Sequence, residues 1–304
     1  MNPQRTISPR AWAELLLLAT IWGGSFIGNR LALVEFGVLS TVAFRVGGAC
    51  LILWCWVALR RLPLPRDPGV WGAFLVMGFL NNALPFTLIT WGQVTIPSGL
   101  AAILNASTAI LGVLVAALVF RDERLTGRRL AGVALGFAGV VVVIGIESLA
   151  RLDLTSLAQL ALLGASLSYA TAAAWARVRL SGLAPQVAAA GMLTGATLIM
   201  FPAALLVEGM PSLHHGPVVW GALTYLAVIS TAFAYLLYYR VLGMAGAGNL
   251  SLVTLLIAPI AVIMGALILN ESLPLRDFIG FALLAAGLMV IDGRAVGRFR
   301  AYFA

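Results

Sequence analysis

Polar and aromatic side chains recur near the middle of long apolar runs, where they could bind a small ligand away from bulk water. Polar groups inside hydrocarbon are costly and usually face the interior of a helix bundle or a water-filled cavity. Trp22 with Ser25, and Tyr235 with Tyr239, are spaced three or four residues apart, so each pair shares one face of a helix. The predicted cavity-lining residues are Trp22, Ser25, Asn81, Asn82, Trp91, Asn105, Ser168, Tyr169, Trp175, Tyr235 and Tyr239.

Each of these residues also has a structural alternative. Serines and asparagines often hydrogen-bond across helices as packing contacts, and tryptophans and tyrosines near span ends often anchor at the membrane interface. The interfacial alternative applies to Trp91 and Tyr239 in particular. Arg45 lies inside an apolar run, so it either ties its helix to backbone carbonyls or meets an anion such as a substrate carboxylate.

The sequence lacks the common catalytic and metal-binding patterns. H-E-x-x-H, G-x-S-x-G and a Walker loop are all absent. His214 and His215 are adjacent in a short loop, and Cys50 and Cys55 point to different sides of a helix. We therefore predict no enzyme activity, no cofactor and no metal site.

Composition places the chain in a membrane. Of its 304 residues, 62% are hydrophobic and only 10% are charged, whereas a soluble domain is about 25% charged. The net charge of +8 comes from arginines scattered in short gaps between apolar runs rather than on one solvated face, which argues against a nucleic-acid partner. The lipid bilayer is the predicted partner, and a monomer or a weak dimer is consistent with the sequence.

Ten apolar runs are each about the 20 residues that a helix needs to cross the bilayer. Runs that are apolar all round fit helices and not the alternating strands of a barrel. The predicted fold is therefore an all-α membrane protein with ten transmembrane helices. They cover approximately 12–31, 40–59, 70–91, 98–120, 128–146, 154–177, 186–207, 217–240, 247–269 and 275–292.

The arginines predict the orientation of these spans. Fifteen of the nineteen fall in the two terminal tails and in the even-numbered gaps, and only Arg30, Arg151 and Arg276 fall in the opposite gaps. Basic residues concentrate on the cytoplasmic side. We therefore predict a bacterial-type cytoplasmic membrane protein with both termini in the cytoplasm.

The chain repeats itself with a spacing of 148 residues. RDERLTGRRLAG at 121–132 aligns with LNESLPLRDFIG at 269–280, and the same shift aligns Gly139 with Gly287. A five-span repeat reverses its direction in the membrane, which explains why the second copy of this turn has lost most of its arginines. We predict two inverted five-helix repeats, residues 1–149 and 150–304, around a central cavity.

Three prolines inside the apolar runs are predicted hinges. Pro85, Pro202 and Pro259 interrupt spans 3, 7 and 9, where a missing backbone donor bends a helix. The position that aligns with Pro259 in the first half is Leu111, so the two halves are predicted to bend differently.

Several of these features resemble a known family. A Trp-Gly pair in the first span (ATIWGGSFIGNR), a glutamate turn before a glycine-spaced last span in each half, and AFRVGGA in the second span resemble the EamA-type branch of the drug/metabolite transporter superfamily. Within that branch the chain is most similar to YddG-type amino-acid exporters. The resemblance implies ten helices, cytoplasmic termini and a cavity lined mainly by spans 1, 3, 4, 6, 8 and 9.

The predicted function is secondary transport of a small metabolite by alternating access. A cavity of indoles, phenols and amides suits an amino acid, including an aromatic or apolar one. A multidrug or nucleotide-sugar-type exchanger of the same superfamily is the alternative. A channel is less well supported because the sequence has no filter or charged ring.

Overall fold

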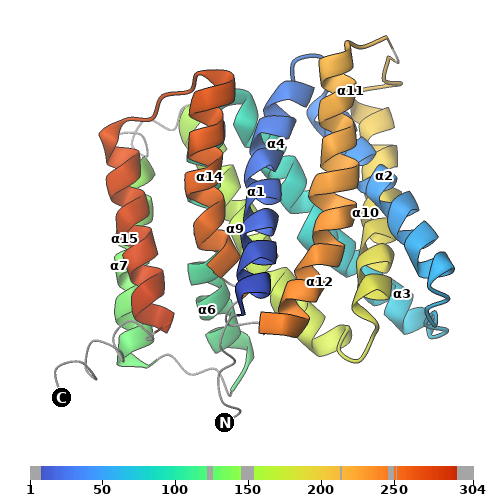
Figure 1. Cartoon of the computed structure of the whole chain (residues 1–304), viewed down its shortest axis with the longest axis horizontal. Helices are drawn as coiled ribbons and strands as arrows, with labels where there is room; N and C mark the ends of the chain where they lie inside the picture. The colour runs from blue at the N-terminus through green and yellow to red at the C-terminus, as the bar shows by residue number, and fades with distance from the viewer. Residues whose placement is uncertain are drawn as a thin grey trace.

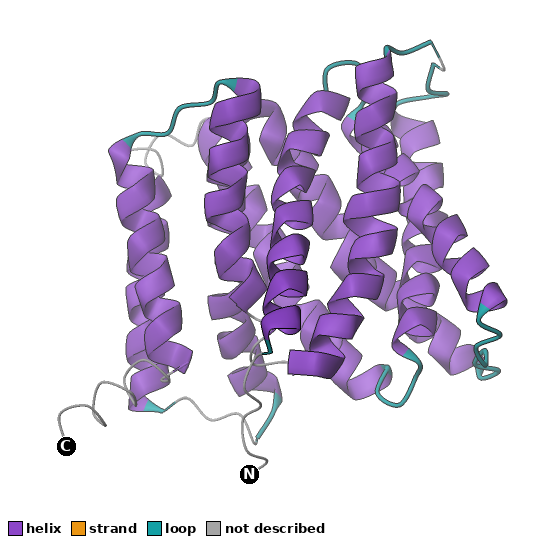
Figure 2. Cartoon of the chain, viewed as in Figure 1, coloured by secondary structure: helices purple, strands orange, loops and turns teal. Residues whose placement is uncertain are grey.

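The computed structural model describes residues 8–121, 126–144, 154–212, 214–245, 250 and 252–292, and the regular elements within them are all helices (Figure 2). The first half contains α1 (Pro9–Ala32), α2 (Val38–Leu59), α3 (Pro68–Gly78), η1 (Phe79–Ala83), α4 (Leu84–Thr95), α5 (Ser98–Asn105), α6 (Thr108–Val119) and α7 (Gly127–Ile144). The second half contains α9 (Leu154–Arg179), α10 (Pro185–Val207), α11 (Pro217–Thr224), η2 (Tyr225–Phe233), α12 (Ala234–Ala245), α14 (Leu252–Leu269) and α15 (Leu275–Asp292).

Within the residues that the structure describes, each of the ten predicted apolar runs overlaps helix. Eight helical segments of the described chain are long and apolar enough to cross a membrane, and a shorter apolar helix covers Leu256–Leu269. The described part of the chain is therefore an all-helical, multi-pass bundle, whereas the count of ten crossings and the inverted arrangement stay predictions. The first residues of α1 and the last of α15 lie at the same end of the bundle (Figure 1).

Two of the long segments change helical register midway. The five-residue π-helix η1 joins α3 to α4, and the nine-residue π-helix η2 joins α11 to α12. A π-helix leaves backbone groups without their usual partners and is frequently found at functional sites. The segment 98–119 is also interrupted, by the turn at Ala106 and Ser107 between α5 and α6.

The helix boundaries repeat with the same spacing as the sequence. Shifted by 148 positions, the first residue of α7, Gly127, falls on Leu275, the first residue of α15, and η1 (79–83) falls on 227–231, inside η2. The packing follows the same pairing, because α2 packs against its counterpart α10 and α7 against its counterpart α15. The spacing read from the sequence therefore recurs in helix starts, in helix defects and in packing.

Helices α7 and α15 form a pair at one edge of the bundle (Figure 1). A Cβ added to Gly132 would lie 2.6 Å from the carbonyl oxygen of Gly287, and one added to Gly139 would lie 2.6 Å from that of Gly280. Only glycine allows this approach. The glycines that align in sequence thus pack crosswise, as they must when two equivalent helices run antiparallel.

Two large hydrophobic clusters fill the rest of the bundle. One lies mainly along α1, α5, α9 and α14, and the other along α2, α3 and α10. Tyr169 of α9 packs against both clusters, as a residue at their seam does. The predicted polar residues gather around this seam.

Candidate functional site

Arg45 is the charged group at the centre of the candidate site. Its side chain belongs to α2 and is only 5% exposed. Its Nε donates to Thr231 Oγ1 at 2.9 Å, and its Nη2 donates to Ser230 Oγ at 3.3 Å. The guanidinium carbon lies 3.8 Å from the ring centroid of Phe86, within the range of a cation–π contact.

Thr231 and Ser230 come from η2, which explains how they reach Arg45. The Thr231 hydroxyl donates to the carbonyl of Leu226 at 2.8 Å, five residues back along the π-helix. That bond fixes the hydroxyl so that its oxygen accepts from Arg45. Both hydrogen-bond partners of Arg45 are side-chain hydroxyls. The structure therefore contradicts the alternative in which Arg45 binds backbone carbonyls.

Arg45 has no anionic partner within the described chain. Ion pairs there involve Arg10 and Arg240 with Glu14, His215 with Glu35, and Arg276 with Asp277. Removing one partner of a buried ion pair costs about 3–5 kcal/mol, because the remaining charge is left uncompensated. The site is electropositive and lacks an anion.

Amide and phenol groups form the neighbouring part of the site. Tyr235 of α12 accepts from Asn81 Nδ2 and from Asn82 Nδ2, each at 3.1 Å. The phenol proton remains available to a further acceptor. Asn82 is completely buried and its Oδ1 has no partner. Such an acceptor can bind a water molecule or a donor group of a ligand.

Trp22 and Tyr169 complete the predicted core of the site. The indole nitrogen of Trp22 donates to the carbonyl of Ser230 at 3.2 Å, and its ring contacts Tyr238 at a centroid distance of 5.7 Å. On the other side, Ser168 donates to the carbonyl of Leu80 at 2.6 Å. Helix α1 thus contacts η2 while α9 contacts η1, so each half of the chain holds the π-helix of the other.

The remaining predicted residues lie further from this cluster. Ser25 donates to the carbonyl of Trp22, one turn back on α1. Trp175 donates to the carbonyl of Ala73 at 3.2 Å, and Tyr239 packs edge-to-face on Tyr238. Asn105 sits at the break between α5 and α6, and its Oδ1 is buried without a partner.

Trp91 is 41% exposed, and none of the ring contacts or hydrogen bonds of the described residues joins it to Arg45 or Tyr235. The exposure of Trp91 agrees with the alternative in which this side chain anchors at the membrane interface.

The three predicted hinges differ in their surroundings. Pro85 is buried and is the second residue of α4, which begins directly after η1. Its ring would clash with the carbonyl four residues back in a regular helix, and the π-helix relieves that clash. Pro202 and Pro259 lie inside α10 and α14, which run on as α-helix through both positions.

Sequence reasoning missed Ser230, Thr231 and Phe86. Ser230 is the position that aligns with Asn82 under the 148-residue shift, so the repeat offered a signal for it. Nothing in the sequence around Thr231 distinguishes it from a packing threonine.

The end of the bundle near the α1–α2 loop is tied by buried polar contacts. Gln93 Nε2 donates to the carbonyl of Phe26 at 2.8 Å, and Asn29 Nδ2 donates to Gln93 Oε1 at 3.0 Å. Glu271 accepts from the backbone N–H of Ser98 at 2.9 Å, and so caps α5. Glu271 belongs to the second glutamate turn, and its counterpart Glu123 in the first turn lies outside the described residues. At the opposite end, Glu14 pairs with Arg240 at 2.5 Å.

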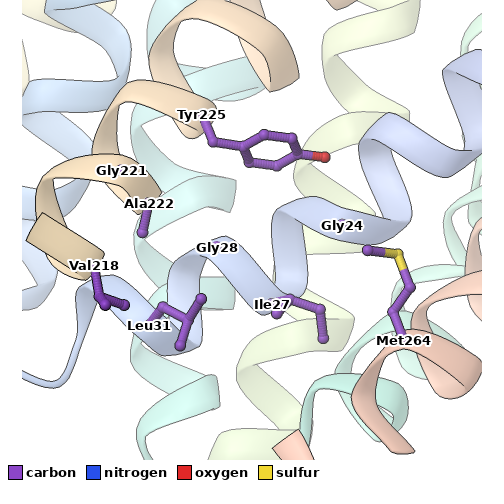
Figure 3. A pocket seen from close by; sticks show the side chains of 9 residues that line it. All are labelled: Gly24, Ile27, Gly28, Leu31, Val218, Gly221, Ala222, Tyr225 and Met264. Carbon is purple, nitrogen blue, oxygen red and sulfur yellow. The ribbon is translucent and has the colours of Figure 1, made fainter. Parts of the chain in front are cut away.

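A separate apolar groove of about 300 Å³ lies beside the site, between α1, α11 and α14 (Figure 3). Gly24, Gly28 and Gly221 leave it open, and the Tyr225 ring closes one end by donating its hydroxyl to the carbonyl of Ile21 at 2.7 Å. On α1 the groove continues the exposed stripe that contains Leu16 and Thr20. It therefore belongs to the outer, lipid-facing surface of the bundle rather than to the Arg45 site.

Comparisons with known proteins agree with this architecture. The EamA-like transporter family matches the chain twice, over residues 11–145 and 156–292. A "Probable terminal-alkyne amino-acid exporter" from Streptantibioticus cattleyicolor is 28% identical, covering 97% of each chain. A "Probable amino-acid metabolite efflux pump" from Escherichia coli is 26% identical, covering 90% of this chain and 92% of that one. A solved structure titled "Crystal structure of protein" has the same fold, with a TM-score of 0.66 at 18% identity over 95% of this chain and 98% of that one.

Proposed function

The chain belongs to the EamA-like transporter family, and we propose that it is a secondary carrier that moves amino acids or similar small metabolites across the cytoplasmic membrane by alternating access. A carrier of this kind needs a substrate site near the middle of the bilayer and two states that open it to opposite sides.

We further propose that the scaffold consists of ten spans in two inverted five-helix repeats, with both termini in the cytoplasm. The 148-residue spacing of helix boundaries, the double family match and the arginine distribution support this arrangement. In such a scaffold, residues 1–149 and 150–304 rock against each other around the central cavity.

The observation that carries the proposal is the polar cluster held between the two π-helices. Arg45 with Ser230 and Thr231 lies at η2, and Asn82 with Tyr235 lies at η1. Each π-helix interrupts a long apolar segment near its middle, which is where a broken helix presents polar groups to a substrate in carriers. A π-helix is also a natural place for a segment to bend.

The chemistry of the cluster favours a zwitterion with an apolar side chain. The guanidinium attracts a carboxylate, the unpaired Asn82 Oδ1 accepts from an ammonium group, and Trp22, Phe86 and Tyr169 provide apolar surface. The names of the two relatives, which refer to amino-acid export and amino-acid metabolite efflux, support the same class.

The test is transport by the purified protein in proteoliposomes. Vesicles preloaded with one unlabelled amino acid should accumulate the radiolabelled form by exchange, and empty liposomes should not. A variant in which Asn82 is replaced by alanine should exchange more slowly, whereas Gly221→Ala, in the lipid-facing groove, should behave as wild type. Failure of the wild type to exchange any of the twenty amino acids would contradict the proposed substrate class.

A further inference from the structure

We propose that Arg45, Ser230 and Thr231 together form the binding site for the carboxylate of the transported substrate. The inference rests on the proposed function, because it assumes that an organic molecule enters the bundle. It adds the chemical group that the molecule must carry and the residues that recognise it.

The free hydrogen-bond donors of Arg45 are the first part of the argument. A guanidinium has five N–H donors in a fixed plane. Thr231 takes the one on Nε and Ser230 takes one on Nη2, and Arg45 makes no other hydrogen bond in the described part of the chain. Three N–H groups, including both on Nη1, therefore remain. A carboxylate binds two parallel N–H groups of one guanidinium in a bidentate fashion.

The two hydroxyls hold the guanidinium in place without neutralising it. Thr231 is itself anchored to the carbonyl of Leu226, and Phe86 lies against the face of the guanidinium. These contacts restrict the rotation of a long side chain, so binding loses less conformational entropy. A carboxylate in place of either hydroxyl would have cancelled the charge. The arrangement is thus positioned for an anion that arrives from outside the protein.

The number of charges selects a carboxylate over a phosphate. Arg45 is the one cation among the described residues of this cluster, whose other members are hydroxyl, amide, phenol and aromatic groups. A single guanidinium balances one negative charge, whereas a phosphate group carries nearly two at neutral pH. A singly charged carboxylate therefore leaves the buried site close to neutral.

The counterpart of Arg45 in the other half argues that the charge is not a requirement of the scaffold. Shifted by 148 positions, Arg45 falls on Leu193, which is fully buried in α10 against α2. The same packing position accepts an apolar side chain. A buried charge at position 45 costs desolvation free energy that an apolar side chain would avoid. A function in binding explains why Arg45 is nevertheless present.

The experiment compares an amino acid with its neutral amide in the full-length protein. The labelled substrate is the amino acid that the wild type exchanges best, and the competitors are the same unlabelled amino acid and its carboxamide. Wild type should prefer the acid roughly 10- to 100-fold, the range expected for a hydrogen-bonded charge pair. Arg45→Gln should lower that preference to about one, and Gly221→Ala should leave it unchanged.

Two further measurements test the carboxylate site even if Arg45→Gln does not fold. Thr231→Val removes the hydroxyl that positions the guanidinium but keeps the charge and the side-chain shape, and it should reduce the acid-over-amide preference several-fold. The wild type itself should gain thermal stability in detergent from the acid and much less from the amide. Both effects depend on the carboxylate and would not follow from a packing role.

The outcomes separate the inference from the proposed function. A wild type that exchanges no amino acid overturns the proposed function. A wild type that exchanges an amino acid but treats acid and amide alike overturns the carboxylate site and leaves the proposed function intact. An unchanged preference in folded Arg45→Gln assigns Arg45 to structure alone.

Discussion

The two π-helices, η1 and η2, occupy equivalent positions in the two halves but are held by different chemistry. η1 carries Asn82 and is followed by Pro85, which cannot take part in a regular helix at that point. η2 contains no proline, and its own Thr231 donates to the carbonyl of Leu226. Each π-helix also accepts one bond from a helix of the other half, from Ser168 to the carbonyl of Leu80 in η1 and from Trp22 to that of Ser230 in η2.

The two halves therefore share a π-helix at equivalent positions, but different residues maintain it in each half. The first half turns amide groups toward Tyr235, whereas the second turns hydroxyls toward Arg45. A substrate lying between them would meet a cation on one side and amide and phenol groups on the other. It would therefore bind in one orientation although the scaffold is nearly symmetric.

The largest expected effect separates the two sides of the site directly. Arg45→Gln should reduce the exchange of an amino acid roughly 10- to 100-fold, because it removes charge-assisted hydrogen bonds, whereas Asn82→Ala should reduce it less, because neutral hydrogen bonds are weaker. Initial rates of exchange in proteoliposomes at matched protein density measure both. An equal loss of exchange rate in the two variants would contradict the proposal that the site has a cationic side at Arg45 and a neutral polar side at Asn82.

A smaller effect is expected where the two halves meet at Tyr235. Tyr235→Phe removes the shared acceptor of the Asn81 and Asn82 amides. Leaving buried donors unpaired costs about 1–3 kcal/mol, so the melting temperature in detergent should fall by several degrees. Phe233→Leu, at an exposed position in the neighbouring turn, is the matched control and should melt near wild type. An unchanged melting temperature in Tyr235→Phe would mean that these amides find other partners.

Pro85→Ala tests how η1 is maintained. Alanine restores a backbone N–H and removes the ring clash, so the segment 79–85 should relax toward a regular α-helix. Hydrogen exchange at 79–83 should slow and transport should fall, while exchange in η2 stays unchanged. If exchange at 79–83 does not change, then tertiary contacts such as Ser168 to Leu80, and not the proline, maintain η1.

The smallest effect concerns the lipid-facing groove and its counterpart. Gly221 aligns with Ala73, whose carbonyl accepts from Trp175, and Ile27 of the groove aligns with Trp175 itself. A Cβ on Gly221 would meet nothing within 4 Å. Gly221→Ala should therefore raise stability by at most about 1 kcal/mol, through helix propensity alone, and leave transport unchanged, as measured by melting and exchange. A clear loss of transport would make the groove part of the substrate path.

Much of the scaffold could be predicted from the sequence because its signals are local. Apolar run length located the helices, and the 148-residue spacing identified Gly132, Gly139, Gly280 and Gly287 as related residues. Their crosswise packing follows from geometry once the two helices run antiparallel. The same spacing leads from Asn82 to Ser230.

The site itself could be predicted only in part, because its bonds join distant positions. Trp22, Asn82 and Tyr235 were identified as polar or aromatic groups inside apolar runs. The partners of Arg45 lie 185 and 186 residues away on η2, and the i to i+5 register that brings them there is set by tertiary contacts. Pro85 indicates an irregularity in the helix near η1, but no residue type in η2 predicts a π-helix there.

The central claim is that η1 and η2 face one shared substrate site. Its most direct test is labelling of single cysteines at Asn81, Ser230 and, as a control, Gly221, in a variant whose Cys50 and Cys55 are replaced by serine. We predict that saturating amino acid strongly slows labelling at Asn81→Cys and Ser230→Cys and leaves Gly221→Cys unchanged. Protection at only one of the two π-helices, or equal protection at all three positions, would contradict a shared site.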